Sequence, residues 1–241
     1  MRIAVLSDIH GNLPALEAVL ASLRPYDAIW QLGDVVGYGP QPNEVVELLA
    51  GENALGVRGN HDSAALGELD TSSFNDDARE AIEWTITQLT ESTRAWLGAL
   101  NRREEFDGFT LVHGSPRDPT WEYVYAVSIA RANINRFSTT HCLVGHTHVP
   151  LVYRQNAANK MEATLPRAGD RLELDERRSL INPGSVGQPR DDDPRASGML
   201  LDTDDMTAEW RRVEYPIDAV QDLMRTAGLP KRLVARLAVG R

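Results

Sequence analysis

The sequence predicts an α/β fold with a second sheet, on three observations. Short runs of aliphatic and β-branched residues alternate with helical patterns in the first half of the chain. Two longer apolar runs flank an Asp-rich turn in the last third, which is typical of an antiparallel hairpin and so of a second sheet. With 241 residues, of which 42% are hydrophobic, the chain can bury one sizeable core, so residues 1–241 are expected to form a single domain.

Six short apolar runs are each expected to form a buried strand. They are residues 3–6, 28–32, 54–57, 109–112, 142–144 and 180–181. Helical patterns lie between the early runs, over residues 13–23 and 43–49. The first of these helices would place Leu16, Val19 and Leu20 on one face, which is the spacing of a helix packed against a sheet.

The rest of the chain predicts further helices and the hairpin. Residues 75–100 are charged but carry spaced apolar residues, which indicates one or two amphipathic helices outside the sheet. The hairpin is expected over residues 199–201 and 208–213, followed by helical stretches over 217–224 and 233–237.

Two segments are predicted to be surface loops. Residues 154–179 are polar and mixed in charge. Residues 187–197 hold the run Asp191 to Asp193 between prolines, and this run is expected to be solvated.

Composition narrows the classes of protein. The formal net charge of −10 opposes binding to nucleic-acid polymers and to anionic membranes, so an anionic substrate would need a local positive centre. The one cysteine, Cys142, lies in an apolar run and is expected to be a buried free thiol, which excludes disulfides and thiolate metal clusters. The first apolar run is too short for a signal peptide and none is long enough to span a membrane, so the protein is expected to be cytoplasmic.

Polar residues follow the predicted strands directly. They are Asp8, His10, Asp34, Asn60, His61, His113, His146 and His148. Residues just beyond the carboxyl ends of neighbouring strands converge on one crevice in an α/β sheet, so these side chains can share a single site.

The types of these residues indicate a metal centre. Histidine nitrogens with Asp or Asn oxygens, and no thiolate, favour Mn, Fe, Zn, Ni or Co. Seven candidate ligands from this set exceed the needs of one tetrahedral site. They suit two divalent metal ions that lie roughly 3.5–4 Å apart and share a bridging carboxylate.

The sequence resembles the calcineurin-like metallophosphoesterase superfamily, in its small prokaryotic phosphodiesterase and phosphatase branch. Five fragments carry the resemblance in the family's order: Asp8-Ile9-His10, Gly33-Asp34-Val35-Val36-Gly37, Gly59-Asn60-His61-Asp62, His113-Gly114 and Gly145-His146-Thr147-His148. They cover roughly the first 150 residues, and Asn182-Pro183-Gly184-Ser185 resembles a further strand-end element of the branch. The resemblance implies a four-layer α-β-β-α sandwich with two mixed sheets and a metal site at the carboxyl ends of the strands.

The resemblance also implies roles for the site residues. One metal would be held by Asp8, His10 and His148, and the other by Asn60, His113 and His146, with Asp34 bridging. The implied mechanism is attack of a metal-activated hydroxide on phosphorus. His61, oriented by Asp62, would stabilise the phosphoryl charge or protonate the leaving oxygen.

The predicted function is hydrolysis of small phosphodiesters or phosphomonoesters, including nucleotides. Two alternatives remain at this point: a metal-binding scaffold of the same fold, and a serine/threonine protein phosphatase. Stable binding to nucleic-acid polymers or membranes is not expected, and a homo-oligomer is left open.

Other residues have both a functional and a structural interpretation. Arg117 and Arg190 could bind phosphate or form surface salt bridges, and Tyr38 could line the pocket entrance or serve only a turn. His141 is expected to be a surface or structural histidine. Three aromatic residues could stack on a nucleobase, pack in the core or contact another subunit: Trp121, Tyr123 and Tyr125.

Overall fold

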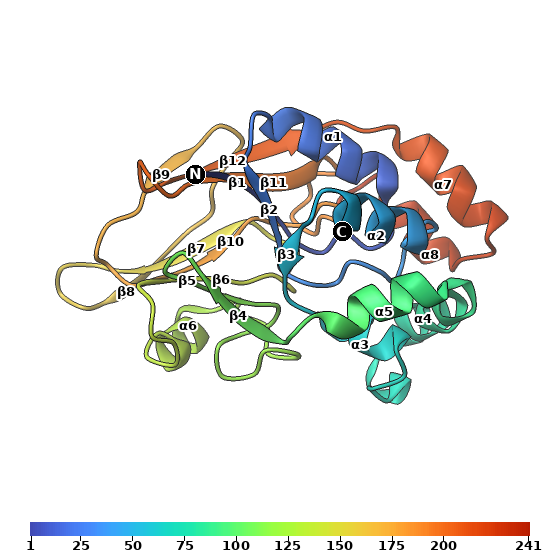
Figure 1. The fold of residues 1–241 in the computed structure, drawn as a ribbon, viewed down its shortest axis with the longest axis horizontal. Coiled ribbons are helices and arrows are strands. Elements are labelled where there is room, and N and C mark those ends of the chain that lie inside the picture. The colour runs from blue at the N-terminus through green and yellow to red at the C-terminus, as the bar shows by residue number, and fades with distance from the viewer.

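Two six-stranded mixed sheets form the centre of the computed structural model, which describes residues 1–241 (Figure 1). Helices cover the outer faces of both sheets, so the layers run helix, sheet, sheet, helix. The predicted α/β fold with two mixed sheets is confirmed.

The first sheet combines parallel strands from the start of the chain with antiparallel strands from its last third. Its order is β3 (Leu55–Gly56), β2 (Ala28–Gln31), β1 (Arg2–Leu6), β11 (Ala196–Asp202), β12 (Thr207–Val213) and β9 (Arg171–Glu173). β1, β2 and β3 are parallel, whereas β11 runs antiparallel to β1 and forms the predicted hairpin with β12.

The second sheet has three parallel strands at its centre. Its order is β4 (Arg103–Phe106), β5 (Phe109–Val112), β6 (His141–Leu143), β10 (Ser179–Asn182), β7 (Leu151–Gln155) and β8 (Met161–Thr164). β5, β6 and β10 are parallel, so their carboxyl ends lie at one edge of the sheet. β4, β7 and β8 add antiparallel pairs at the two sides.

Alternation along each strand creates the core between the sheets. In β1, Ile3 and Val5 face the second sheet, while Ala4 and Leu6 face the helices, because successive side chains of a strand point to opposite faces. Trp210 of β12 lies in the same inter-sheet core, and its indole Nε1 donates a hydrogen bond to the Asn182 carbonyl at 3.0 Å. This bond satisfies a buried donor and joins the two sheets.

Helices on the first sheet form one continuous apolar cluster with its outer face. They are α1 (Leu13–Leu23), α2 (Pro42–Gly51), α4 (Asp76–Gln88), α5 (Glu91–Ala99), α7 (Ile217–Thr226) and α8 (Lys231–Arg236). α6 (Val127–Asn133) covers the second sheet (Figure 1). α1 begins where the Asn12 side chain accepts a hydrogen bond from the Ala15 backbone. The one or two amphipathic helices predicted over residues 75–100 are two, α4 and α5.

The prediction that residues 154–179 form a surface loop is wrong in part. This segment contains β8 and β9, each of which is the last strand at one side of its sheet. Most residues of both strands are exposed, so the apolar alternation that marks a strand in sequence is missing there.

The Asp191 to Asp193 run is not simply solvated, in contrast to the prediction. Each of its carboxylates forms an ion pair with an arginine: Asp191 with Arg212, Asp192 with Arg241 and Asp193 with Arg195. The Arg212 side chain is only 6% exposed, so the run fastens this loop to β12.

No helix in the structure is both long enough and apolar enough to cross a membrane.

We predict that Gly198→Ala lowers the free energy of unfolding by about 1–3 kcal/mol, because α1 packs tightly on β11 at this position. A Cβ atom at Gly198 would lie 2.5 Å from Cγ1 of Val19. Gly98→Ala is the control, since Gly98 in α5 has open space around it and alanine there should raise the free energy of unfolding by up to about 1 kcal/mol. Urea denaturation measures both, and equal stabilities for the two variants would contradict this account of the packing.

Candidate metal centre

All seven predicted metal ligands lie together at the carboxyl ends of the strands, and none is more than 2% exposed. They follow β1 (Asp8, His10), β2 (Asp34), β3 (Asn60), β5 (His113) and β6 (His146, His148). Strands of both sheets therefore deliver side chains to one buried crevice, as expected for strand ends that share an edge.

The ligand atoms form two groups that share Asp34. In each group the candidate ligand atoms lie within 4.8 Å of one another. The first group is Asp8, His10, Asp34 and His148, and the second is Asp34, His113 and His146. Asn60 joins the second group, since its Oδ1 lies 3.0 Å from Nε2 of His113.

Hydrogen bonds to backbone carbonyls fix the tautomers of the first pair of histidines. Nδ1 of His10 donates to the Val36 carbonyl at 3.1 Å, and Nδ1 of His148 donates to the Gln188 carbonyl at 2.6 Å, because a carbonyl oxygen can only accept. In the neutral rings each Nε2 is then an unprotonated lone pair, and the two Nε2 atoms face each other at 3.2 Å. Burial lowers the pKa of both histidines well below the usual value, so a proton between them is disfavoured.

Two lone pairs at this distance repel unless a cation lies beside them. Metal-binding histidines commonly donate a hydrogen bond from the N–H of their second ring nitrogen to a backbone carbonyl, which is the arrangement of His10 and His148. This donor set therefore fits a divalent metal ion.

The second group has the same design. Nδ1 of His113 donates to the Leu32 carbonyl at 2.8 Å, and its Nε2 lies 3.0 Å from Nδ1 of His146 and 3.3 Å from Oδ2 of Asp34. Two buried atoms in this group have no hydrogen-bond partner, namely Oδ2 of Asp34 and Nε2 of His146. Burial opposes the charge on His113, but Asp34 outweighs burial and raises the pKa of His113 to about 9. In the absence of metal, a proton on His113 thus supplies the positive charge that this group requires.

The two carboxylates sit in different electrostatic environments. Burial raises the pKa of Asp8 to about 7, and its Oδ2 accepts a hydrogen bond from Oγ of Ser7 at 2.7 Å. Burial acts in the same direction on Asp34, but His113 and His61 outweigh it and hold the pKa of Asp34 below its usual range. Asp34, the shared residue, is therefore ionised.

Most of these ligands have backbone conformations that residues other than glycine rarely adopt. The φ angles are positive at Asp8 (52°), His10 (49°), Asp34 (53°), His146 (66°) and His148 (60°). Each such residue costs on the order of 1 kcal/mol, and strain of this kind concentrates at functional sites. Backbone hydrogen bonds hold the strained turns, such as Asp8 N–H to the Gly33 carbonyl at 3.1 Å and His10 N–H to the Asp34 carbonyl at 2.9 Å.

Two glycines permit the loops to approach this closely. A Cβ atom at Gly59 would collide with the Asp34 carboxylate, and one at Gly145 would collide with Oγ of Ser7. Glycine is required at both positions because backbone comes directly against the site.

His61 lies beside the two groups, and Asp62 lies behind it. The His61 backbone N–H donates to Oδ1 of Asp34 at 2.9 Å, its ring is 4% exposed, and its Nδ1 has no partner. Burial lowers the pKa of His61 to about 4. The expected contact between Asp62 and His61 is not formed, because the Asp62 oxygens accept hydrogen bonds from the backbone of Val36 and Gly59, each at 3.0 Å. Asp62 therefore fixes the loops that carry Asp34 and His61.

The structure distinguishes Arg117 from Arg190, for which the sequence allowed either phosphate binding or a surface salt bridge. Arg117 forms an ion pair with Glu122, which matches the salt-bridge interpretation. Arg190 has no carboxylate within 4.0 Å, and its guanidinium lies 5.7 Å from the centre of the Tyr38 ring. His141 is structural, since it is buried in β6 and its Nδ1 lies 2.7 Å from Oγ of Ser179.

The aromatic residues also differ in their relation to the site. Tyr38 packs against His10 and His61, with ring centres 4.6 Å and 4.3 Å apart. Tyr123 stacks on His146 at 3.7 Å. Trp121 packs against Phe74, and Tyr125 is 71% exposed. Tyr38 and Tyr123 line a cavity of about 540 Å³ next to the candidate metal centre.

Sequence reasoning missed the roles of several supporting groups. Ser185, which belongs to the strand-end element over residues 182–185, donates a hydrogen bond to the Asp8 carbonyl at 2.8 Å, and the carbonyls of Leu32, Val36 and Gln188 orient the histidines. Backbone carbonyls carry no sequence signal. Arg236 of α8 also lines the cavity, and its spacing of four residues from Arg232 was the one available hint.

Comparison with known proteins agrees with this geometry. The model of the calcineurin-like phosphoesterase superfamily domain matches residues 1–206. The chain is 38% identical to the uncharacterized protein MJ0912 of Methanocaldococcus jannaschii, over 99% of this chain and 98% of that protein. It is 29% identical to phosphodiesterase YfcE of Escherichia coli, over 83% of this chain and 87% of that protein.

A solved structure gives the same answer for the fold. The crystal structure of a metallophosphoesterase from Sphaerobacter thermophilus superimposes with a TM-score of 0.92 at 46% identity, covering 100% of this chain and 99% of that one. Together with the shared, buried Asp and His groups, these matches show that the chain is a phosphoester hydrolase that belongs to the calcineurin-like phosphoesterase superfamily.

Proposed function

We propose that this enzyme hydrolyses small phosphate esters at a centre of two divalent metal ions. One observation carries the proposal: two buried groups of acceptor atoms share the ionised carboxylate of Asp34. The first metal would be held by Asp8, His10, Asp34 and His148, and the second by Asp34, Asn60, His113 and His146. The absence of thiolates from this set favours Mn, Fe, Zn, Ni or Co.

The metal pair, when bound, would lower the pKa of a coordinated water and offset the charge that builds up on the phosphoryl oxygens. The chain's own contribution is to hold the donors in place before substrate arrives. The positive φ angles and the carbonyl bonds of His10, His113 and His148 fix each ring in one orientation, so little reorganisation remains for the reaction.

His61 is proposed to act on the substrate. Because burial lowers its pKa to about 4, its ring is neutral near pH 7 and carries one N–H hydrogen. This N–H can donate a hydrogen bond to a phosphoryl oxygen or to the leaving oxygen, and the bond stabilises the negative charge that develops there. The bond from the His61 backbone to Asp34 keeps the ring at a fixed place beside both metal groups.

Asp62 is proposed to be a positioning residue. Its carboxylate joins the Val36 backbone, in the loop after Asp34, to the Gly59 backbone, in the loop before His61. It therefore supports catalysis through the spacing of these loops.

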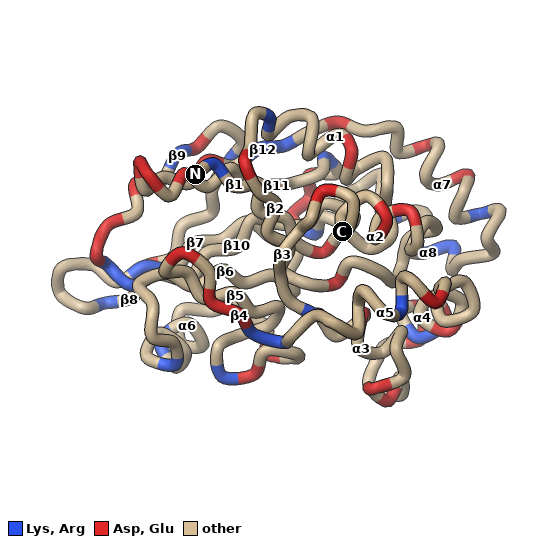
Figure 2. Tube along the Cα trace, in the orientation of Figure 1, with Lys and Arg blue, Asp and Glu red and all other residues tan.

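A small ester suits the surroundings better than a polymer. Lys and Arg are interspersed with Asp and Glu along the chain and form no continuous basic stripe (Figure 2). The protein has a net charge of −10, which would repel long nucleic acids. The E. coli relative is named a phosphodiesterase, which supports diesters among the substrates, and monoesters fit the same centre.

We predict that His61→Ala lowers kcat by on the order of 10²–10³-fold, because it removes the proposed hydrogen-bond donor but no metal ligand. Turnover of bis-p-nitrophenyl phosphate and metal content by elemental analysis should be measured on the same sample. Arg117→Ala is the control and should keep both values, since Arg117 is paired with Glu122. A His61→Ala enzyme of undiminished turnover would refute the catalytic role.

We further predict that Asp34→Ala loses both metals, whereas His148→Ala loses mainly one, because only Asp34 belongs to both groups. Elemental analysis gives the number of metal ions per chain. The unfolding temperature gives a second measure, since a metal that binds only the folded chain raises it. Two tightly bound metals in Asp34→Ala would rule out the bridging role.

A further inference from the structure

We propose that Arg190 and Arg236 form a second phosphate-binding site beside the metal centre, which selects substrates whose leaving group carries another phosphate. This inference rests on the proposed function, because the first phosphate of such a substrate would lie at the metals. It goes further in naming the substrate class: organic bisphosphates and polyphosphate esters.

The cavity that holds these two arginines adjoins the metal centre through two tyrosine rings. Two of its walls are Tyr38 and Tyr123. Tyr38 packs on His10 of the first metal group, and Tyr123 stacks on His146 of the second. A volume of about 540 Å³ accommodates a leaving group of nucleotide size.

Arg190 carries a charge that no carboxylate neutralises. Its guanidinium donates to Oε1 of Gln188 at 2.8 Å and 3.3 Å and has no ion pair within 4.0 Å. Its positive charge also lowers the pKa of His10, His61 and His148, so it lies within electrostatic reach of the metal centre. A guanidinium of this kind suits a phosphate, which it can bind through two parallel hydrogen bonds.

Arg236 lines the same cavity from α8, and no Asp or Glu side chain forms an ion pair with it. Its Nε donates to the backbone oxygen of Arg241. Burial and the charge of Arg190 together lower the pKa of Arg236 to about 10. Two guanidiniums that no Asp or Glu side chain pairs with therefore line one cavity of a protein with ten excess negative charges, and a bound anion would offset the repulsion between them.

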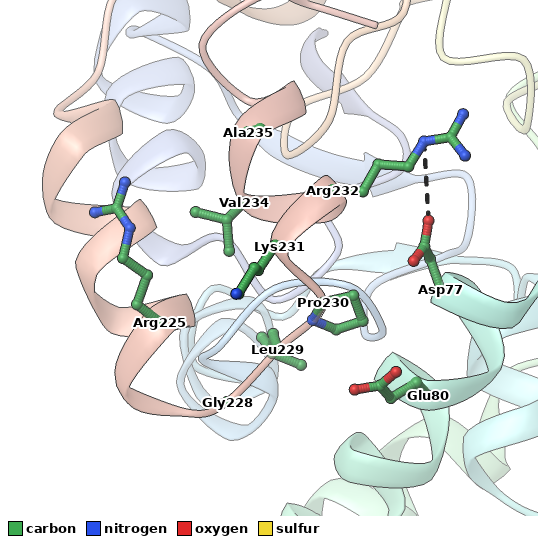
Figure 3. Close-up of a pocket in the computed structure, with 10 residues that line it drawn as sticks. All are labelled: Asp77, Glu80, Arg225, Gly228, Leu229, Pro230, Lys231, Arg232, Val234 and Ala235. Atoms are coloured by element: carbon green, nitrogen blue, oxygen red, sulfur yellow. Dashed lines mark ion pairs between the residues drawn. The ribbon is translucent and has the colours of Figure 1, made fainter.

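The two acidic residues that line the cavity are paired with other arginines, so they offset the charge of Arg190 and Arg236 only in part. Asp76 forms an ion pair with Arg79, and Asp77 lies 3.9 Å from Arg232, the third arginine of the cavity. Figure 3 shows the Asp77 pair between α4 and α8.

A larger cavity of about 770 Å³ lies between α4, α7 and the start of α8 (Figure 3), but it is a weaker candidate. Asp77 and Glu80 accompany its Arg225 and Lys231, and no aromatic residue links it to the metal centre. Arg236, by contrast, lies beyond residues 1–206 that match the family model.

Calorimetric binding to the metal-loaded full-length chain tests the proposal without requiring turnover. The probes are adenosine 3′,5′-bisphosphate and adenosine 5′-monophosphate, which differ by one phosphate. We expect the wild type to bind the bisphosphate at least about tenfold more tightly, and Arg236→Gln to bring this ratio close to one. Arg236→Lys should retain part of the ratio through its charge.

Arg225→Gln is the matched control, because Arg225 pairs with Asp222 on α7 and does not line this cavity. It should retain the wild-type ratio, and unfolding temperatures should show that all variants are folded. A wild-type ratio near one, or an unchanged ratio in Arg236→Gln, would overturn the second site. Absence of phosphoester hydrolysis with a normal binding ratio would instead count against the proposed function alone.

Discussion

The structure depends on a concentration of acceptor atoms that cannot satisfy one another. Backbone carbonyls take the Nδ1 hydrogens of His10 and His148, so the two Nε2 lone pairs face each other at 3.2 Å, and Oδ2 of Asp34 and Nε2 of His146 have no hydrogen-bond partner. Burying such a set costs free energy unless a positive charge compensates it. The strained turns, the close glycines and the two sheets all serve to hold this unfavourable arrangement in place.

The sandwich explains how residues far apart in sequence reach this point. The parallel strands of the two sheets bring their carboxyl ends to one site, and the inter-sheet core locks one sheet against the other through side chains such as Trp30 and Trp210. The first metal group takes His148 from the second sheet, and the second group takes Asp34 from the first. Neither sheet holds a complete group.

The sequence was sufficient for the parts of the molecule that are locally encoded. The central strands are continuous apolar runs and the ligands follow them directly, so both the α/β fold and the clustering of Asp8, Asp34 and His146 could be predicted. The edge strands β8 and β9 were not predicted, because their exposed residues lack the apolar alternation that marks a strand. The hydrogen bonds of Asp62 and the approach of Arg236 depend on tertiary placement, which no local pattern records.

Each metal group takes residues from both sheets, so a bound cation would link one sheet to the other. The one cysteine, Cys142, is buried and free, so no covalent cross-link limits the opening of the sandwich. A cation in the first group would close a loop of about 140 residues between Asp8 and His148, and a cross-link that closes a longer loop restricts the unfolded chain more. Coordination would then act as a reversible cross-link that adds to the inter-sheet core, and removing the ion would lower the stability of the sandwich as reduction of a disulfide does.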